Sequence, residues 1–402
     1  MAMRHPDLGF FDEQADLTDA ALYATAARPF GDASVLPPLA YRSKTFSELE
    51  DEKIWTRSWV AVGLQQQIPN PGDVLPFTVG YHGIHVQRGG DGGLTGRFNK
   101  AQHGGCRAVP LQCQTGRRTK CSFTSCGYSR DRDVISADEL GENTPAMHQY
   151  LGLMPEKLLP VRVATWGPYI FVNLDPEAAA LADELGDMPG DITSYFQKPL
   201  AVAAGQWFEC AANWKLTGRA FADACLAPRA SPSIPRAGPF FSASAEAGEI
   251  DFTFDAVLPM LREPSDATSG NGTICWLFPN LLLALFPTHV VSVILQPLSM
   301  GECLQRFNLL TGAPALSEAA ESVSRLRDSW SSCLARSASE AKRNQELAER
   351  WGTASNPESI DKDLPTENSL FGYHFQQYLI QKLSTGHQHY WNAPLYRSGI
   401  AT

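Results

Sequence analysis

The sequence lacks the long apolar runs and the basic surplus that mark membrane-spanning and nucleic-acid-binding proteins. No stretch reaches the roughly 18 consecutive apolar residues that a membrane-spanning helix requires. Lys and Arg number 33 against 43 Asp and Glu, so the formal net charge is −10. An acidic chain is repelled by phosphate backbones and anionic lipid surfaces. We therefore expect neither nucleic acid nor a membrane as a partner.

A secretory signal and a regular cysteine framework are also missing. The first residues, MAMRHPDLGFFDEQADL, mix charged and apolar side chains and contain no apolar signal core. The nine cysteines are an odd number and mostly scattered, which suits a reducing compartment better than a set of disulfides. These features predict a cytoplasmic protein. Four cysteines, Cys106, Cys113, Cys121 and Cys126, nevertheless form a local cluster.

What the chain does contain is enough apolar material for more than one domain. It has 402 residues, of which 44% are hydrophobic and 10% aromatic, and a single core rarely extends over such a length. Residues 1–40 are rich in Pro, Gly and small side chains and predict an irregular arm. From Ser47 to Trp59 the apolar residues recur at helical spacing, with Ser47 placed as the N-cap.

Two regions of different periodicity follow and predict an α+β protein with two antiparallel sheets. Residues 72–99 and 161–175 alternate short apolar segments with Gly-rich turns, as in a small antiparallel β-domain. Residues 178–200 look helical and acidic, and the segment from 207 passes from a strand into a helix. Strands are predicted within 249–261, 273–298 and 302–310, and a long helix over 315–351. The expected organisation is an arm (1–40), a first domain (41–176) and a second domain (177–402).

The order of seven short motifs resembles the α subunit of Rieske-type ring-hydroxylating oxygenases, from about Tyr41 to about Leu383. The motifs are YRSKTFSELEDEKIWTRSWVAVG, PNPGD, DGGLTGRFNKAQH, GPYIFVNLD, ANWKL, FPNLLLALFP and DKDLPTENS. The resemblance implies an N-terminal Rieske-like β-domain and a C-terminal antiparallel sheet with helices that holds a mononuclear non-haem iron. It also implies trimers, or hexamers of three α and three β subunits, and a place in aromatic compound metabolism.

The resemblance places a Rieske cluster in the first domain, but two of its four ligands are replaced. The family pattern is C-x-H followed, after about 15 to 17 residues, by C-x-x-H, so that each iron receives two protein ligands. Here the matching positions are Ala101, His103, Cys121 and Thr124. Each iron would keep one ligand, so we expect these vestigial positions not to bind a normal cluster.

The iron site implied for the second domain is altered as well. The family helix reads D-x-x-H-x4-H and is completed by a distant carboxylate, which gives a face of two histidines and one carboxylate. The NWKL motif sets the register, and it aligns Asp223 with the acid that bridges to a neighbouring Rieske centre. Leu226 and Ser231 replace the two histidines, and Asp363 matches the carboxylate ligand. We therefore expect no oxygen activation in this chain.

Several residues have both a functional and an ordinary interpretation. His103, Cys106, Cys121 and Cys126 could form a zinc site or an atypical iron–sulfur centre, or simply fill the space left by the cluster. A disulfide between Cys106 and Cys126 is disfavoured in a reducing compartment. Asp223 could do no more than pair with Arg219 one helical turn away. Three histidines near the C-terminal end are interpreted as solvated or hydrogen-bonded: His374, His387 and His389. Four aromatic residues are interpreted as core packing: Trp207, Phe208, Trp214 and Phe221.

These observations predict a pseudoenzyme subunit of a Rieske oxygenase system, not catalytic alone and with no cofactor expected. It would assemble with an active α-subunit paralogue in a trimeric or hexameric ring, and through that partner with a ferredoxin or reductase. One alternative is a protein that binds a small molecule in an apolar pocket lined by LFPNLLLALFP, or does metal-free chemistry there. Another is an oxidoreductase subunit with an atypical Cys/His metal centre.

Overall fold

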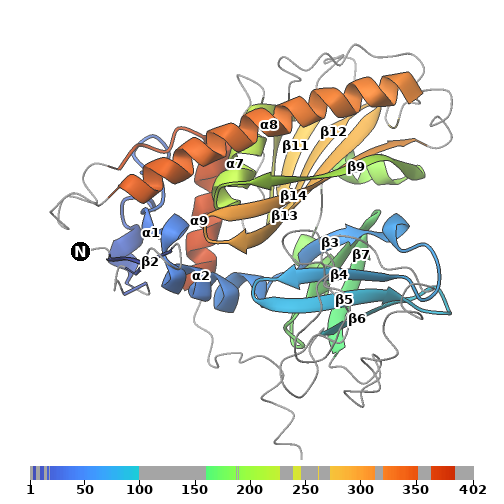
Figure 1. The fold of residues 1–402 in the computed structure, drawn as a ribbon, viewed down its shortest axis with the longest axis horizontal. Coiled ribbons are helices and arrows are strands. Elements are labelled where there is room, and N and C mark those ends of the chain that lie inside the picture. Colours follow the sequence, from blue (N-terminus) through green and yellow to red (C-terminus); the bar gives the residue numbers. More distant parts are fainter. Residues whose placement is uncertain are drawn as a thin grey trace, which may run out of the picture. The chain divides into compact units, whose positions relative to one another are not determined.

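In the computed structural model the chain divides into two compact units (Figure 1). One comprises Met1–Ile54 together with Ala182–Gly386, and the other is built around Trp55–Leu181. The structure describes residues 3–5, 10–12, 16–17, 19–98, 160–186, 188, 190–226, 239–245, 261, 272–312, 320–351 and 364–384.

The unit around Trp55–Leu181 is a six-stranded antiparallel sheet in the order β3-β8-β7-β6-β5-β4. Its strands are β3 (Val60–Leu64), β4 (Val74–Val79), β5 (His82–Arg88), β6 (Leu94–Phe98), β7 (Pro160–Trp166) and β8 (Tyr169–Asn173). Two-residue turns connect β4 to β5 and β7 to β8, where Gly80 and Gly167 have φ values of 54° and 53°. Positive φ is what tight hairpin turns require. The strands predicted from the Gly-rich turns are thus confirmed.

The other unit contains a second six-stranded antiparallel sheet, in the order β10-β11-β12-β13-β14-β9. Its strands are β9 (Leu200–Cys210), β10 (Phe240–Ala245), β11 (Gly272–Leu277), β12 (Leu281–Phe286), β13 (His289–Ser299) and β14 (Glu302–Gly312). Every residue of β12 is buried, as are most of β13 and β14. Strands buried on both faces read as continuous apolar runs, which explains the sequence LLLALF.

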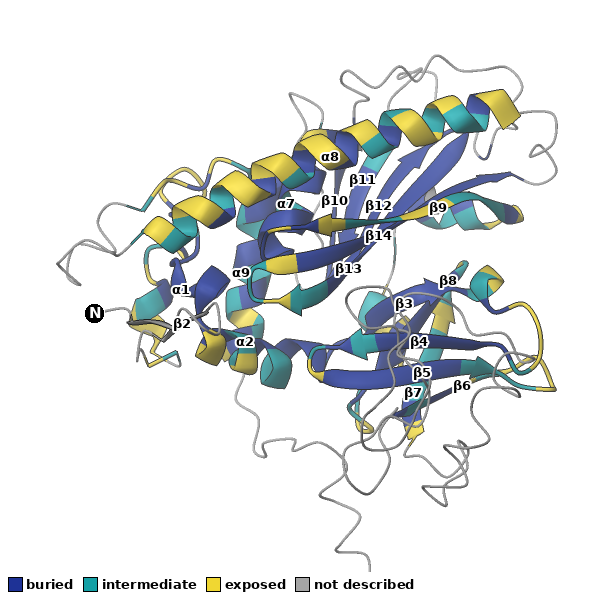
Figure 2. Cartoon of the chain, viewed as in Figure 1, coloured by how far each residue is buried: buried dark blue, intermediate teal, exposed yellow. Residues whose placement is uncertain are grey.

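Three helices cover one face of this second sheet: α7 (Trp214–Cys225), α8 (Ala320–Arg350) and α9 (Leu370–Ser384). Trp276 on β11 stacks against Phe375 of α9 with ring centroids 4.3 Å apart. α7 approaches so closely that a Cβ on Gly218 would lie 2.4 Å from the Trp276 ring. Figure 2 shows α8 with a buried stripe and an exposed outer side. The long amphipathic helix predicted over 315–351 is confirmed for Ala320–Arg350.

The remaining short elements lie in the N-terminal region, between β3 and β4, and in the connection into β9. They are β1 (Met3–His5), β2 (Phe10–Asp12), η1 (Ala20–Tyr23), α1 (Leu39–Arg42), α2 (Lys44–Glu50), η2 (Asp51–Trp55), η3 (Gln65–Gln67), α5 (Leu181–Leu185), α6 (Gly190–Thr193) and η5 (Ser194–Phe196). The predicted N-cap at Ser47 is wrong. Ser43 caps α2 instead, because its backbone is extended and its Oγ accepts a hydrogen bond from the Phe46 N–H.

The predicted fold class, two antiparallel sheets accompanied by helices, is confirmed. Two local predictions differ. The acidic segment 178–200 forms short helical turns rather than one helix, and the strand predicted within 249–261 lies outside the described residues except for Leu261. Within the described part of the chain, no helix has the length and apolarity needed to span a membrane.

Candidate functional site

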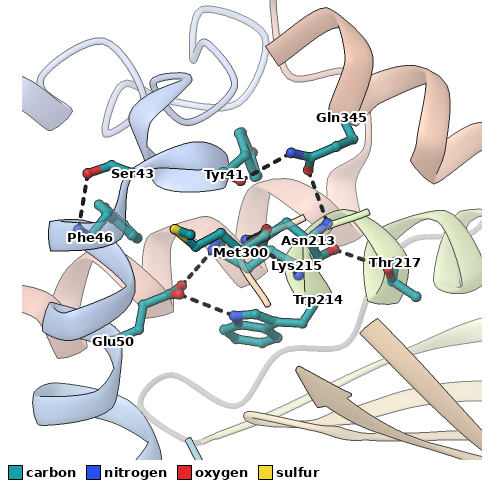
Figure 3. A network of polar contacts seen from close by, with 10 residues as sticks. All are labelled: Tyr41, Ser43, Phe46, Glu50, Asn213, Trp214, Lys215, Thr217, Met300 and Gln345. Atoms are coloured by element: carbon teal, nitrogen blue, oxygen red, sulfur yellow. Dashed lines mark hydrogen bonds and ion pairs between the residues drawn. The ribbon is translucent and has the colours of Figure 1, made fainter. Parts of the chain in front are cut away.

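The N-terminal end of α7 is fixed by hydrogen bonds from Asn213. The side-chain oxygen of Asn213 accepts from the Lys215 N–H at 3.1 Å, and its amide nitrogen donates to the Met300 carbonyl at 2.8 Å. Its backbone N–H donates to Gln345 Oε1 of α8 at 3.0 Å (Figure 3). An N-cap of this kind satisfies donors that the first helical turn leaves open. The NWK motif therefore sets where α7 starts and ties it to α8.

A buried ion pair follows directly and joins α7 to α2. Lys215 Nζ lies 2.6 Å from Glu50 Oε1, with the two side chains 2% and 4% exposed. Trp214 Nε1 donates to Glu50 Oε2 at 3.3 Å (Figure 3). The rings of Tyr41, Phe46 and Trp214 surround the ammonium group at 5.3–5.5 Å. Burial raises the pKa of Glu50 and lowers the pKa of Lys215, and the opposite charge of each partner counteracts both shifts.

The other end of α7 carries a second polar cluster, centred on Asp223. Ser369 Oγ donates to Asp223 Oδ1 at 2.5 Å, and Arg219 Nε approaches Asp223 Oδ2 at 3.4 Å. Arg219 also contacts Glu367 Oε1 at 2.6 Å. The ion pair between Arg219 and Asp223 that the sequence suggested thus forms. The same Ser369 hydroxyl accepts from the Gly372 N–H near the start of α9, so the cluster connects α7 to α9.

Burial dominates the acid–base behaviour of this cluster. The pKa of Glu367 is raised to about 7, chiefly by desolvation, while the positive charge of Arg219 acts in the opposite direction. Desolvation also raises the pKa of Asp223, against the hydrogen bond from Ser369 and the charge of Arg219. Both carboxylates form hydrogen bonds or ion pairs with other side chains of this chain. The sequence interpretation had assigned no role to Glu367 or Ser369, although both belong to the quoted DKDLPTENS motif.

α7 ends where the resemblance implied an iron ligand. Leu226 is the C-cap residue; it has an extended backbone, donates its N–H to the Asp223 carbonyl and forms a β-bridge with Ala245. It is half-buried and offers no donor atom to a metal. Ser231 and Asp363 lie outside the described residues. In the portion of the chain that the structure describes, no group of three or more His, Cys, Asp or Glu side chains could hold a metal ion. The described residues therefore do not fit a site of two histidines and one carboxylate.

In the sequence, the Rieske positions fall between two strands that are neighbours in the first sheet. β6 ends at Phe98 and β7 starts at Pro160, and the two strands pair through Gly96 with Val161 and Arg97 with Pro160. The predicted vestigial positions, and the Cys/His set proposed for zinc or an atypical centre, fall in the interval and outside the described residues: Ala101, His103, Cys106, Cys121, Thr124, Cys126.

A cavity of about 550 Å³ lies between α1, α7, α8 and residues 364–368. Its charged lining residues come from α7 and α8: Arg219, Asp223, Arg336, Glu340, Arg343. Apolar side chains including Tyr41 and Leu216 complete the wall. The lining predicted from LFPNLLLALFP is not part of this cavity, because residues 281–286 form β12 in the interior of the sheet and are fully buried.

The remaining sequence candidates have ordinary structural positions. Trp214 and Phe221 are core residues, 1% and 0% exposed. Trp207 and Phe208 are only half-buried on the edge strand β9, so the core assignment is wrong for these two. His374 is half-buried on α9 beside Tyr373, whereas His387 and His389 lie outside the described residues.

Comparisons with known proteins place these features in context. No family model matches the chain. A chloroplastic choline monooxygenase from Beta vulgaris is 24% identical over 295 residues, which cover 68% of this chain and 62% of that protein. The oxygenase subunit of a glycine betaine monooxygenase from Pseudomonas aeruginosa is 27% identical over 182 residues, which cover 45% and 41%. The chain thus matches less than two thirds of the length of these curated relatives.

Solved structures show the same fold at lower identity. Naphthalene 1,2-dioxygenase with indole bound in its active site has a TM-score of 0.62 at 16% identity, covering 92% of this chain and 95% of that one. The quaternary ammonium Rieske monooxygenase CntA has a TM-score of 0.58 at 15% identity, covering 90% and 98%. The expectation that no cofactor is involved is wrong, because the relatives are Rieske oxygenases, which carry a Rieske iron–sulfur cluster and a non-haem iron.

Proposed function

We propose that this protein, whose homologues and structural neighbours are Rieske oxygenase α subunits, is a non-catalytic, α-subunit-like component of a Rieske non-haem iron oxygenase system. It assembles with an active α-subunit paralogue in a trimeric or hexameric ring. Oxygen activation takes place at the iron of that paralogue, which receives its electrons from a ferredoxin or a reductase.

The C-terminal end of α7 carries this proposal. In the family that the sequence resembles, the acid that aligns with Asp223 is followed three residues later by a metal-binding histidine. Leu226 occupies that position in this chain. An apolar side chain cannot coordinate iron, and Leu226 instead ends the helix and bridges to Ala245. The Asp223 carboxylate is already engaged by Ser369 and Arg219 of the same chain.

The anchoring of α7 supports a scaffold role. The helix is tied to α2 by Lys215 and Glu50, to α8 by Asn213 and Gln345, and to the segment before α9 by Asp223. None of these contacts involves a metal ligand. A folded α subunit that binds an active paralogue stabilises the assembly by mass action, and this requires no oxygen chemistry at α7.

Co-expression with an active Rieske oxygenase α subunit and its reductase tests the proposal. We expect one stable complex by size-exclusion chromatography, with turnover that is abolished by replacing an iron-ligating histidine of the paralogue. Leu226→Ala in this chain should change turnover by less than about twofold, because the position is not an iron ligand. Leu226→Ile provides the matched control for packing at the C-cap.

The isolated chain provides the opposing measurement. If it consumes oxygen in proportion to product when supplied with a reductase, and Asp223→Asn abolishes that activity, the proposal is wrong. Iron and acid-labile sulfide should be measured on the same samples, so that a lost activity is not confused with a lost cofactor.

The cavity beside Asp223 favours a second candidate function, the binding of a small molecule. Its volume of about 550 Å³ falls within the range of ligand pockets, and apolar walls with a few charged groups are typical of such sites. Under this alternative the chain forms no complex with the oxygenase subunits. A thermal shift with small amphipathic compounds, lost in a cavity-filling Ala220→Leu variant, would support it.

A further inference from the structure

The cavity beside Asp223 has more positive than negative groups on its described lining. Three arginines line it against two acids: Arg219, Arg336, Arg343; Asp223, Glu340. Arg343 pairs with Glu340 on α8, and Arg219 pairs with Asp223 on α7. Much of the remaining wall is apolar and includes Leu36, Leu216, Ala220 and Trp351. A wall of this kind suits a ligand with an apolar body and an anionic head group.

Arg219 is the most sheltered of the three arginines. Its side chain is 23% exposed, whereas that of Arg343 is 68% exposed and Arg336 is exposed on α8. A guanidinium matches the geometry of a carboxylate, and the interaction strengthens away from water. Arg219 already contacts two carboxylates, since its Nη2 lies 2.6 Å from Glu367 Oε1 and its Nε lies 3.4 Å from Asp223 Oδ2. An anion entering the cavity therefore meets a guanidinium that two acids share.

Glu367 is the acid of this cluster that water stabilises least. It lies between two lining residues, Thr366 and Asn368, but its own side chain is only 2% exposed. Its Oε1 also accepts a hydrogen bond from the Ser369 N–H at 2.8 Å. The Asp223 side chain, in contrast, is 34% exposed and itself lines the cavity. A buried carboxylate that loses the full charge of its partner binds a proton more readily than an exposed one.

The groups that face Glu367 come from three parts of the chain. Arg219 and Asp223 lie on α7, Tyr41 lies on α1, and Ser369 follows Glu367 in sequence. Burial and the charge of Asp223 raise the pKa of Glu367 to about 7, against Arg219 and the Ser369 N–H. Tyr41 stays a neutral phenol near pH 7, because burial raises its pKa. Glu367 is therefore poised to change its charge near neutral pH.

We propose that the cavity binds small amphipathic carboxylates through Arg219, and that Glu367 takes up one proton from solvent as the ligand binds. The ligand carboxylate replaces Glu367 as the charged partner of the guanidinium, so that three negative charges do not meet at one arginine. This inference rests on the second candidate function above, the binding of a small molecule, and it names the class of ligand.

Proton uptake gives the binding a defined pH dependence. A third carboxylate beside Arg219 raises the pKa of Glu367 further, since a like charge disfavours the ionised form. At pH values above the pKa of Glu367 in the free protein, about 7, each binding event must take a proton from solvent. The affinity then falls by up to about tenfold per pH unit. Well below that pKa Glu367 already carries the proton, so the affinity becomes independent of pH.

Calorimetry on the full-length protein tests the proposal, with sodium hexanoate as the probe. Titrations at pH 8 in phosphate and in Tris give the number of protons taken up, because the two buffers release different heats when they ionise. We expect close to one proton per bound hexanoate at pH 8 and far less at pH 6. The Kd for hexanoate should rise by about tenfold between pH 6 and pH 8.

Three variants separate the roles of the two residues. Glu367→Gln should still bind hexanoate but lose both the proton uptake and the pH dependence, because the amide does not titrate. Arg219→Met should raise the Kd by about tenfold or more. Arg327→Met is the matched control: Arg327 also lies on α8 and pairs with an acid, Asp328, but it is not a lining residue of the cavity. Its Kd should stay within about twofold of the wild type.

Hexanamide and hexylammonium complete the experiment. If either binds as tightly as hexanoate, the cavity binds small molecules but the assignment to carboxylates is wrong. If none of the three probes binds, the second candidate function itself fails. Hexanoate binding without proton uptake at pH 8 overturns the role of Glu367, as does uptake that is lost in Asp223→Asn and kept in Glu367→Gln. The wild-type titrations decide the question even if a variant fails to fold.

Discussion

Removing the positive partner of the buried ion pair should be among the most destabilising single changes in this protein. Lys215→Met leaves the Glu50 carboxylate 4% exposed, with the Trp214 N–H at 3.3 Å as its remaining hydrogen bond in the network of Figure 3. Breaking a buried pair on one side costs about 3–5 kcal/mol. The double variant Lys215→Met, Glu50→Leu should cost far less than the sum of its parts, because no buried charge remains.

The pH dependence of this effect follows from the same geometry. Desolvation raises the pKa of Glu50, and the charge of Lys215 is the largest effect that lowers it. Without Lys215 the pKa of Glu50 therefore rises further. The variant can then bury a neutral carboxylic acid at low pH but must bury a charge, or bind a proton, at higher pH. The cost of Lys215→Met should therefore be smaller at pH 5 than at pH 8.

Urea unfolding followed by circular dichroism measures these costs, with transitions fitted separately for the two units because a single two-state transition is not assured. Lys44→Met is the matched control: the Lys44–Glu48 pair on α2 is 52% and 51% exposed, and such pairs contribute about 0.5 kcal/mol or less. If Lys215→Met costs no more than Lys44→Met, the buried pair does not anchor α7.

Two further predictions concern the same unit. Burial raises the pKa of Glu367 to about 7 from 4.5, so the native state keeps a proton that the unfolded state has released. The free energy of unfolding should thus fall by up to about 3 kcal/mol as pH rises from 4.5 to 7. Glu367→Gln should flatten that slope in urea unfolding at several pH values, and an unchanged slope would contradict it. Gly218→Ala should cost about 1–3 kcal/mol in the same assay, because its Cβ would lie 2.4 Å from Trp276. In Gly205→Ala the nearest contact is 3.6 Å, so this control should change stability by about 0.5 kcal/mol or less.

The sequence by itself was sufficient for the two sheets and for the long helix α8. Alternating apolar residues, Gly-rich turns and a 3.6-residue period are local patterns, and each is read from neighbouring positions. The same holds for the strand-to-helix passage at NWKL, where Asn213 caps α7. The order of the motifs also predicted the correct family of folds. The capping residue of α2 was missed by four positions, because Ser43 and Ser47 are equivalent by residue type and differ only in backbone conformation.

Tertiary structure decided which polar groups meet. Glu50 and Lys215 are 165 residues apart, and Asp223 and Ser369 are 146 apart, so no local spacing could pair them. Periodicity reveals which face of an element is buried, but the partner of a buried charge or thiol depends on how separate elements pack. That packing places the buried polar contacts described above around α7.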